Sequence, residues 1–276
     1  MKLEQAVAEH YAHGSLEQAI LAALTAAGKD VDQLTPKDLA PVDEFHVGGR
    51  PATVAFAEQF GPYPEMRLLD IGSGLGGAAR YFAREHDCRV TGIDLSAEYV
   101  AVANALAARV GLGERVSCRQ GSALALPFAP GSFDGAYMFH VGMNIEDKSG
   151  LFAEVRRVLA PEGVFGIYDV MRLADGELSY PVPWAGGPDS SFVADAATYR
   201  RLLEANGFEV LKERDRREFA LGVFAQMRAR GAAAGPAPLG LHIVMGSTAA
   251  QKVKNMIGDI TSGLIAPTEI ICRRAG

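Results

Sequence analysis

The sequence lacks several features that would each point to one class of protein. None of its apolar runs approaches the ~20 residues that a membrane-spanning helix needs. Lys and Arg number 27 against 33 Asp and Glu, and the net charge of −6 excludes the cationic excess on which general nucleic-acid binding depends. The opening Met1–Gln5 has no basic segment followed by an apolar core, so we expect no secretory signal.

Cysteine is scarce as well. Cys88, Cys118 and Cys272 are far apart, form no CxxC pair and cannot all be joined in disulfides. This pattern is typical of a reducing compartment, and we expect a cytoplasmic protein with no metal site. Hydrophobic residues make up 49% and charged residues 22%, which is the composition of a globular chain.

Residues 66–170 alternate short strand-like runs with helical runs. The alternation predicts a parallel sheet with right-handed crossovers and helices on both faces. In such sheets ligands bind beyond the carboxyl ends of the strands, which is where we expect the chemistry. The predicted strands are 66–71, 88–93, 115–120, 133–139 and 163–169, followed by 208–212 and 267–272.

Helical patterns flank this region. Residues 1–60 are predicted to be helical, with Thr35 as an N-cap before Pro36. Residues 219–264 are predicted to form two helices interrupted by the flexible stretch 231–236. We therefore expect a helical lid over 1–60 and a domain over 61–276 that carries a helical cap insertion at about 217–264.

A glycine-rich turn follows the first strand. Gly72, Gly74 and Gly76 fit the GxGxG pattern of enzymes that use S-adenosylmethionine (SAM), while Gly72, Gly74 and Gly77 fit the GxGxxG pattern of dinucleotide sites. The second strand ends in Asp94, which is suited to accept hydrogen bonds from both hydroxyls of a ribose. An alternative for Asp94 is to cap the helix that starts near Ser96.

Two observations separate these ligands. Asp70 precedes the turn, where a carboxylate would repel a pyrophosphate and attract the cationic amino-acid end of SAM. No tyrosine has a lysine four residues later, so the YxxxK pair of short-chain dehydrogenases is absent. Both favour SAM over NAD, and an NAD-dependent oxidoreductase is the alternative from another class.

On these residues the chain resembles class I SAM-dependent methyltransferases. Asp70 to Gly76 (DIGSGLG) is similar to their first motif, LPFAPGSFDGAYMFH to the motif around the fourth strand, and LFAEVRRVLAPEGVFGIYD to the helix and strand that follow. The small-molecule branch, with sarcosine/dimethylglycine, phosphoethanolamine and ubiquinone/menaquinone-pathway enzymes, is the most similar. The resemblance implies an α/β, Rossmann-like, seven-stranded mixed sheet whose last strand is antiparallel and inserted.

The resemblance also implies the residues that bind SAM. After the third strand many relatives carry an acid for the adenine amino group, whereas this chain has Ser122 and Ala123, so the hydroxyl of Ser122 or the backbone of Ala123 replaces it. The predicted cofactor-binding residues are Asp70, Gly72, Gly74, Gly76, Asp94, Leu95, Ser122 and Ala123.

Catalytic and substrate residues are predicted at the strand ends and in the lid. His140 ends the fourth strand and is either a general base or a hydrogen-bonded structural histidine. Tyr11 and His46 are lid candidates, with ordinary packing as the alternative. The predicted substrate-binding residues are Asn144, Asp169 and Trp184, for which a turn, a cap and plain packing are the alternatives.

The predicted reaction is methyl transfer to a small molecule, most favourably an amine nitrogen. Carbon or oxygen methylation of a quinone-like or natural-product acceptor is the alternative within the class. We expect neither nucleic-acid binding nor membrane insertion. The helices of 219–264 are expected either to shape the acceptor site or to form a homodimer contact.

Overall fold

The structure is a computed structural model that describes residues 2–11, 14–234 and 237–276. Its centre is a seven-stranded sheet in the order β3-β2-β1-β4-β5-β7-β6, and β7 is antiparallel to both of its neighbours. The predicted mixed sheet with an inserted last strand is confirmed. The strands are β1 (Arg67–Ile71), β2 (Arg89–Asp94), β3 (Val116–Gln120), β4 (Phe133–Phe139), β5 (Leu159–Arg172), β6 (Phe208–Asp215) and β7 (Ile265–Arg274).

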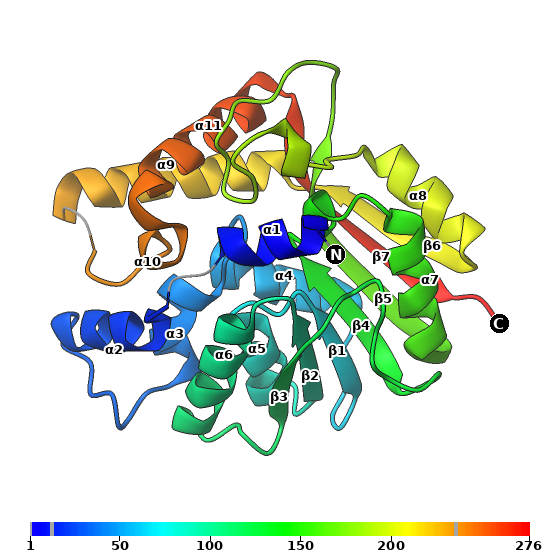
Figure 1. The fold of residues 1–276 in the computed structure, drawn as a ribbon, viewed down its shortest axis with the longest axis horizontal. Helices are drawn as coiled ribbons and strands as arrows, with labels where there is room; N and C mark the ends of the chain where they lie inside the picture. The colour runs from blue at the N-terminus through cyan, green and yellow to red at the C-terminus, as the bar shows by residue number, and fades with distance from the viewer. Residues whose placement is uncertain (1, 12–13, 235–236) are drawn as a thin grey trace.

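Helices cover both faces of the sheet (Figure 1). On one face α4 (Gly49–Phe60), α5 (Gly77–Glu85) and α6 (Ala97–Arg109) bury residues such as Phe56 and Leu106. On the other face α7 (Lys148–Val158) and α8 (Ala196–Ala205) form a second core. The central strands are apolar almost without alternation because both of their faces are covered.

Strand β5 is longer than the sequence predicted. It runs from Leu159 to Arg172, whereas 163–169 was expected. Its start pairs with β4 through Leu159 and Phe133, and its end pairs with β7 as far as Arg172 and Ile265. Antiparallel pairing with β7 thus extends β5 past the point where the parallel strands stop.

The N-terminal region is helical, with α1 (Lys2–His10), α2 (Leu16–Ala26) and α3 (Pro36–Asp43) before α4. Helix α3 begins after Thr35 as predicted, and the backbone N–H of Thr35 donates to Asp38 Oδ2 at 2.9 Å. Its last residue, Asp43, pairs with the fully buried Arg80 of α5 at 2.5 Å. This buried ion pair fixes α3 to the sheet domain.

A helical insertion separates β6 from β7 in the chain. It contains α9 (Arg217–Ala234), α10 (His242–Met245) and α11 (Ala249–Ser262). Helix α9 continues through Gly231 to Ala234, so the expected break at 231 is wrong, and Pro236 lies outside the described residues. Figure 1 shows the three helices gathered on one side of the molecule, with α1 between them and the β1–β4 half of the sheet. We call α9–α11 the cap.

Candidate active site

A large cavity lies where the carboxyl ends of β1, β2 and β4 meet the N-terminal helices and the cap. Its volume is about 1550 Å³. Pockets for one small ligand have volumes of ~300–1,000 Å³, so this cavity has room for two molecules side by side. We refer to the part lined by the glycine turn and the β2 end as the nucleotide chamber, and to the part lined by the cap as the acceptor chamber.

The glycine turn forms one wall of the nucleotide chamber. Gly72 and Gly74 have φ of +66° and +53°, a left-handed conformation that favours glycine. A Cβ at Gly72 would lie 2.5 Å from Val141, whereas a Cβ at Gly74 would meet nothing within 4 Å. Gly74 therefore leaves its backbone open to a ligand. Gly76 does not line the cavity and instead precedes α5 as its N-cap, beside Arg80.

Asp94 joins the end of β2 to this turn. Its Oδ2 accepts from the Gly74 N–H at 2.8 Å and its Oδ1 from the Ser96 N–H at 2.9 Å. The N-cap of α6 is Ser96, which accepts from Tyr99 N at 3.2 Å, so the helix has its cap without Asp94. Burial raises the pKa of Asp94. The carboxylate is thus held at the cavity wall by two backbone donors.

The remaining predicted cofactor residues divide into two groups. Leu95 and Ala123 line the cavity beside Asp94. Ser122 does not line it, because its hydroxyl donates to Glu4 of α1 and accepts from Leu124 N at 3.0 Å. At this strand end, residues 121, 123 and 124 line the cavity instead.

Two buried polar groups of the nucleotide chamber have no hydrogen-bond partner among the described residues. They are Oδ2 of Asp70 and the hydroxyl of Tyr99. Burial raises the pKa of Asp70 to about 7, so a cation beside it would favour its ionised form. Sequence reasoning missed Tyr99, although an aromatic residue one turn after the β2 acid was a usable signal. With the open backbone at Gly74, these groups fit a ligand that carries a cation and several hydroxyls, as SAM does.

His140 lines the cavity, but both of its ring nitrogens have backbone partners. Nε2 accepts from the Val47 N–H and Nδ1 donates to the Tyr168 carbonyl, each at 3.2 Å. These partners fix the tautomer, because an N–H can only donate and a carbonyl can only accept. Burial lowers the pKa of His140 to about 4, so the ring is neutral at physiological pH.

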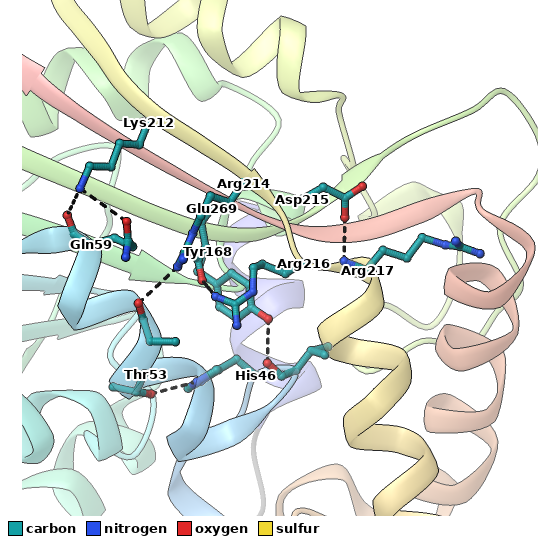
Figure 2. Close-up of polar contacts among 12 residues, drawn as sticks. His46, Thr53, Gln59, Tyr168, Lys212, Arg214, Asp215, Arg216, Arg217 and Glu269 are labelled. Atoms are coloured by element: carbon teal, nitrogen blue, oxygen red, sulfur yellow. Dashed lines mark hydrogen bonds and ion pairs between the residues drawn. The ribbon is translucent and has the colours of Figure 1, made fainter.

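Val47 is held a second time from the sheet. The hydroxyl of Tyr168 on β5, a residue labelled in Figure 2, donates to the Val47 carbonyl at 2.9 Å. In the same figure Thr53 of α4 faces the His46 ring, with Oγ1 3.1 Å from Nε2. Burial lowers the pKa of His46 to about 3, and its Nε2 lies 3.1 Å from the Gly49 carbonyl. Hydrogen bonds therefore hold the loop between α3 and α4 against the ends of β4 and β5.

One lid candidate, Tyr11, meets two of the substrate candidates, Asn144 and Trp184, at one side of the cavity. The Tyr11 hydroxyl donates to Asn144 Oδ1 at 3.4 Å, and Asn144 Nδ2 donates to the Trp184 carbonyl at 2.8 Å. All three residues line the cavity. Trp184 is 2% exposed, and its indole N–H donates to Ser191 Oγ at 3.0 Å. Burial raises the pKa of Tyr11.

The structure does not bring Asp169 into the cavity. Its Oδ2 accepts from the hydroxyl of Tyr199 on α8 at 2.6 Å, and burial raises its pKa to about 6. Neighbouring residues of a strand face opposite sides of the sheet. Since Tyr168 belongs to the core on the α4–α6 face, Asp169 points to the opposite face, where α8 lies, and β5 ends only at Arg172. This geometry therefore argues against the predicted contact between Asp169 and an acceptor.

The acceptor chamber is formed mainly by residues that the sequence patterns did not single out. Phe219, Val223 and Met227 come from α9, and Val253 and Met256 come from α11. Met143 and Met245 also line the chamber, whereas Met138 of β4 is in the core of the sheet. No local motif marks the cap residues, because their helices reach the site only through the tertiary fold.

Comparisons with known proteins agree with this geometry. A family profile described as "Methyltransferase domain" matches residues 69–167. A sterol 24-C-methyltransferase of Gibberella zeae is 29% identical over 167 residues, which are 58% of this chain and 43% of that protein. The chain thus spans less than half of this relative.

Two solved structures share the fold. Phosphoethanolamine N-methyltransferase 2 of Haemonchus contortus, in complex with SAM, has a TM-score of 0.71 and 21% identity over 85% of this chain and 54% of that one. Geranyl diphosphate C-methyltransferase of Streptomyces coelicolor has a TM-score of 0.70 and 17% identity over 100% and 99% of the two chains. The chain is thus similar to methyltransferases over residues 69–167, and its seven-stranded sheet has the fold of these two structures.

Proposed function

We propose that this chain transfers a methyl group from SAM to a small-molecule acceptor inside the cavity. The observation that carries the proposal is the pair of adjoining chambers, one with the glycine turn and Asp94 and one with apolar walls. When bound, SAM supplies an activated methyl group on its sulfonium. The protein then has to orient the two molecules and exclude water.

The cofactor-binding roles follow from the positions of the residues. Asp70 faces the cationic end of SAM, the backbone at Gly72 and Gly74 approaches the ligand, and Asp94 accepts from the ribose hydroxyls. Leu95 and Ala123 lie beside the adenine, and the Tyr99 hydroxyl is a further donor. Gly76 contributes through the shape of the turn, and Ser122 through its hydrogen bond to α1.

For His140 we propose a positioning role. A general base needs a free nitrogen at physiological pH, whereas Nε2 of His140 is occupied by Val47 N. His140→Ala is expected to reduce kcat through movement of the Val47 loop, while the pH profile keeps its shape. Loss of a kinetic pKa in the variant would instead identify His140 as the base.

The acceptor atom stays a prediction, with an amine nitrogen first and carbon or oxygen as the alternative. The names of the compared proteins include carbon and nitrogen acceptors and so do not narrow the choice. They give no support to an NAD-dependent oxidoreductase. Within the described residues, no helix combines the length and apolar character needed to cross a membrane.

We further propose that the protein acts in the cytoplasm and binds no nucleic acid, and that its cap helices form part of the acceptor site. The three cysteines are all free and buried, and the net charge is −6. A homodimer is the alternative use of the cap, and gel filtration with light scattering distinguishes the two.

Isothermal titration with SAM, S-adenosylhomocysteine and NAD tests the proposal. We expect both sulfur nucleosides to bind and NAD to give no heat beyond dilution. Release of S-adenosylhomocysteine in the presence of amines, phenols and quinones then identifies the acceptor class. Binding of NAD without binding of SAM would refute the proposed function.

A further inference from the structure

The walls of the acceptor chamber are mainly apolar, although Glu218 and Gln226 of α9 and His242 of α10 also line the cavity. Phe219, Val223 and Met227 of α9 face Val253 and Met256 of α11, and the cavity continues to Trp184. Met227 is 55% exposed although it lines the cavity, which leaves apolar surface without a protein partner. Such surface is stabilised when an apolar ligand covers it.

Charge in the cavity is strongly unbalanced. Two cationic side chains, Lys37 and Arg50, line it among the described residues. Arg50 already pairs with Glu85 at 2.9 Å and lies over the ring of Tyr81, and Lys37 is exposed. The acidic side chains that line the cavity are Glu4, Asp43, Glu44, Asp70, Asp94, Glu146, Asp147 and Glu218.

Phosphate groups are bound in proteins by arginine, lysine, clustered backbone donors or a bridging metal ion. Among the described residues the cavity offers no buried lysine or arginine that lacks a partner, and those of its carboxyl groups that are ionised repel an anion. Over the described residues, no three Asp, Glu, His or Cys side chains come together as a ligand set for a metal ion. These residues therefore form no metal cage of three protein ligands, and a metal-bridged phosphate would have to rest on one or two carboxylates and the phosphate itself, which is the case that the titration with Mg²⁺ tests.

From these observations we infer that the acceptor has a large apolar body and no phosphate or other anionic group. The inference deepens the proposed function by naming the substrate class for the same cavity. It separates this chain from two proteins of the same fold, whose names include phosphoethanolamine and geranyl diphosphate.

The chain carries its own reporter for a test. Trp184 is the only tryptophan of the sequence, lies on the cavity wall and is 2% exposed. Its fluorescence can be followed while the protein, saturated with S-adenosylhomocysteine, is titrated with geraniol or with geranyl diphosphate. These probes share one hydrocarbon chain and differ in the diphosphate. The diphosphate is titrated with and without Mg²⁺.

We expect geraniol to give a saturable change and geranyl diphosphate to bind at least about 10-fold more weakly, because its charge must leave water beside carboxylates. Equal or tighter binding of the diphosphate, with or without Mg²⁺, would overturn the inference. So would the absence of any response to geraniol.

A pair of variants on α9 locates the binding. Val223→Arg places a charge in the chamber and is expected to weaken geraniol binding about 10-fold or more. Ala225→Arg adds the same charge at an exposed position of the same helix that does not line the cavity, and should bind geraniol as the wild type does. An unchanged affinity in Val223→Arg, with a melting temperature like that of Ala225→Arg, would contradict the assignment.

The titration of S-adenosylhomocysteine distinguishes the two proposals. If that ligand does not bind while geraniol does, the proposed function fails and the apolar chamber stands. If S-adenosylhomocysteine binds while geraniol does not, the inferred class of acceptor is refuted and the proposed function stands.

Discussion

The two chambers of the cavity are built in different ways. The nucleotide chamber consists of short strand-end segments around residues 70–76, 94–96 and 121–124, joined by hydrogen bonds such as those from Gly72 N–H to the Ile93 carbonyl and from Gly74 N–H to the Asp94 carboxylate. The acceptor chamber is assembled from side chains as distant in sequence as Tyr11, Trp184 and Met245. Backbone geometry thus fixes the cofactor half, while side-chain identity determines what the other half accepts.

The two halves are tied together by the N-terminal helices. Asp43 at the end of α3 pairs with Arg80 behind the glycine turn, and the next residues reach His140 and Tyr168 through Val47. On the far side of this loop, Arg214 and Arg216 of β6 and its end bind Glu269 of β7, as Figure 2 shows. Substitutions in and around the loop after α3 can therefore show whether the stability of the fold and the binding of ligands depend on the same contacts.

The largest effect is expected from breaking the Arg80–Asp43 pair. Both side chains are buried, so Arg80→Met leaves an uncompensated carboxylate and should lower the free energy of unfolding by about 3–5 kcal/mol. Urea denaturation followed by circular dichroism measures it. The double variant Arg80→Met/Asp43→Leu removes both charges and should recover much of the loss. A loss below about 1 kcal/mol in the single variant would mean that the pair does not hold the halves together.

The next effect concerns the nucleotide chamber alone. Asp94→Ala removes charge-assisted hydrogen bonds of about 1.5–3 kcal/mol each to the ribose hydroxyls and frees the Gly74 N–H. The affinity for SAM should fall at least about 100-fold by isothermal titration, with geraniol binding retained. Asp175→Ala, an exposed carboxylate outside the cavity, is the control. Wild-type SAM affinity in Asp94→Ala would remove Asp94 from the site.

The smallest effect is a pH-dependent change in stability that comes from Glu44, the residue after α3. Burial, and then the neighbouring Asp43, raise the pKa of Glu44 from its ordinary 4.5 to about 8. A carboxyl whose pKa is raised by folding binds more protons folded than unfolded, so it costs stability increasingly as pH rises from 4.5 to 8. Glu44→Gln removes this cost.

The melting temperature of Glu44→Gln should therefore exceed that of the wild type at pH 8, by about 2–4 °C for each kcal/mol of the cost that is removed, and by little at pH 4.5. Glu58→Gln, at an exposed position of α4, controls for the loss of one charge. A difference between Glu44→Gln and the wild type that does not vary with pH would show that Glu44 titrates normally.

The sequence by itself determined the features that depend on near neighbours in the chain. Strands β1 to β4, the turn at Gly72–Gly76 and the acid that ends β2 were predicted because strand, turn and cap preferences act within a few residues. The inserted antiparallel β7 followed from the resemblance to the family and is confirmed by the sheet. The division into a lid over 1–60 and a domain over 61–276 stays a prediction.

The tertiary structure alone decided which side chains reach the cavity. Asp169 turned away from it because β5 extends along β7 and because successive strand residues face opposite sides of the sheet. Nε2 of His140 is not free, because it accepts a hydrogen bond from the N–H of Val47, some ninety residues earlier in the chain. The sequence did not reveal that α9 and α11 line the cavity, because an apolar helical face has the same sequence pattern whether it packs against protein or against a ligand. Contacts between distant segments settle that difference, and they form only when the whole chain has folded.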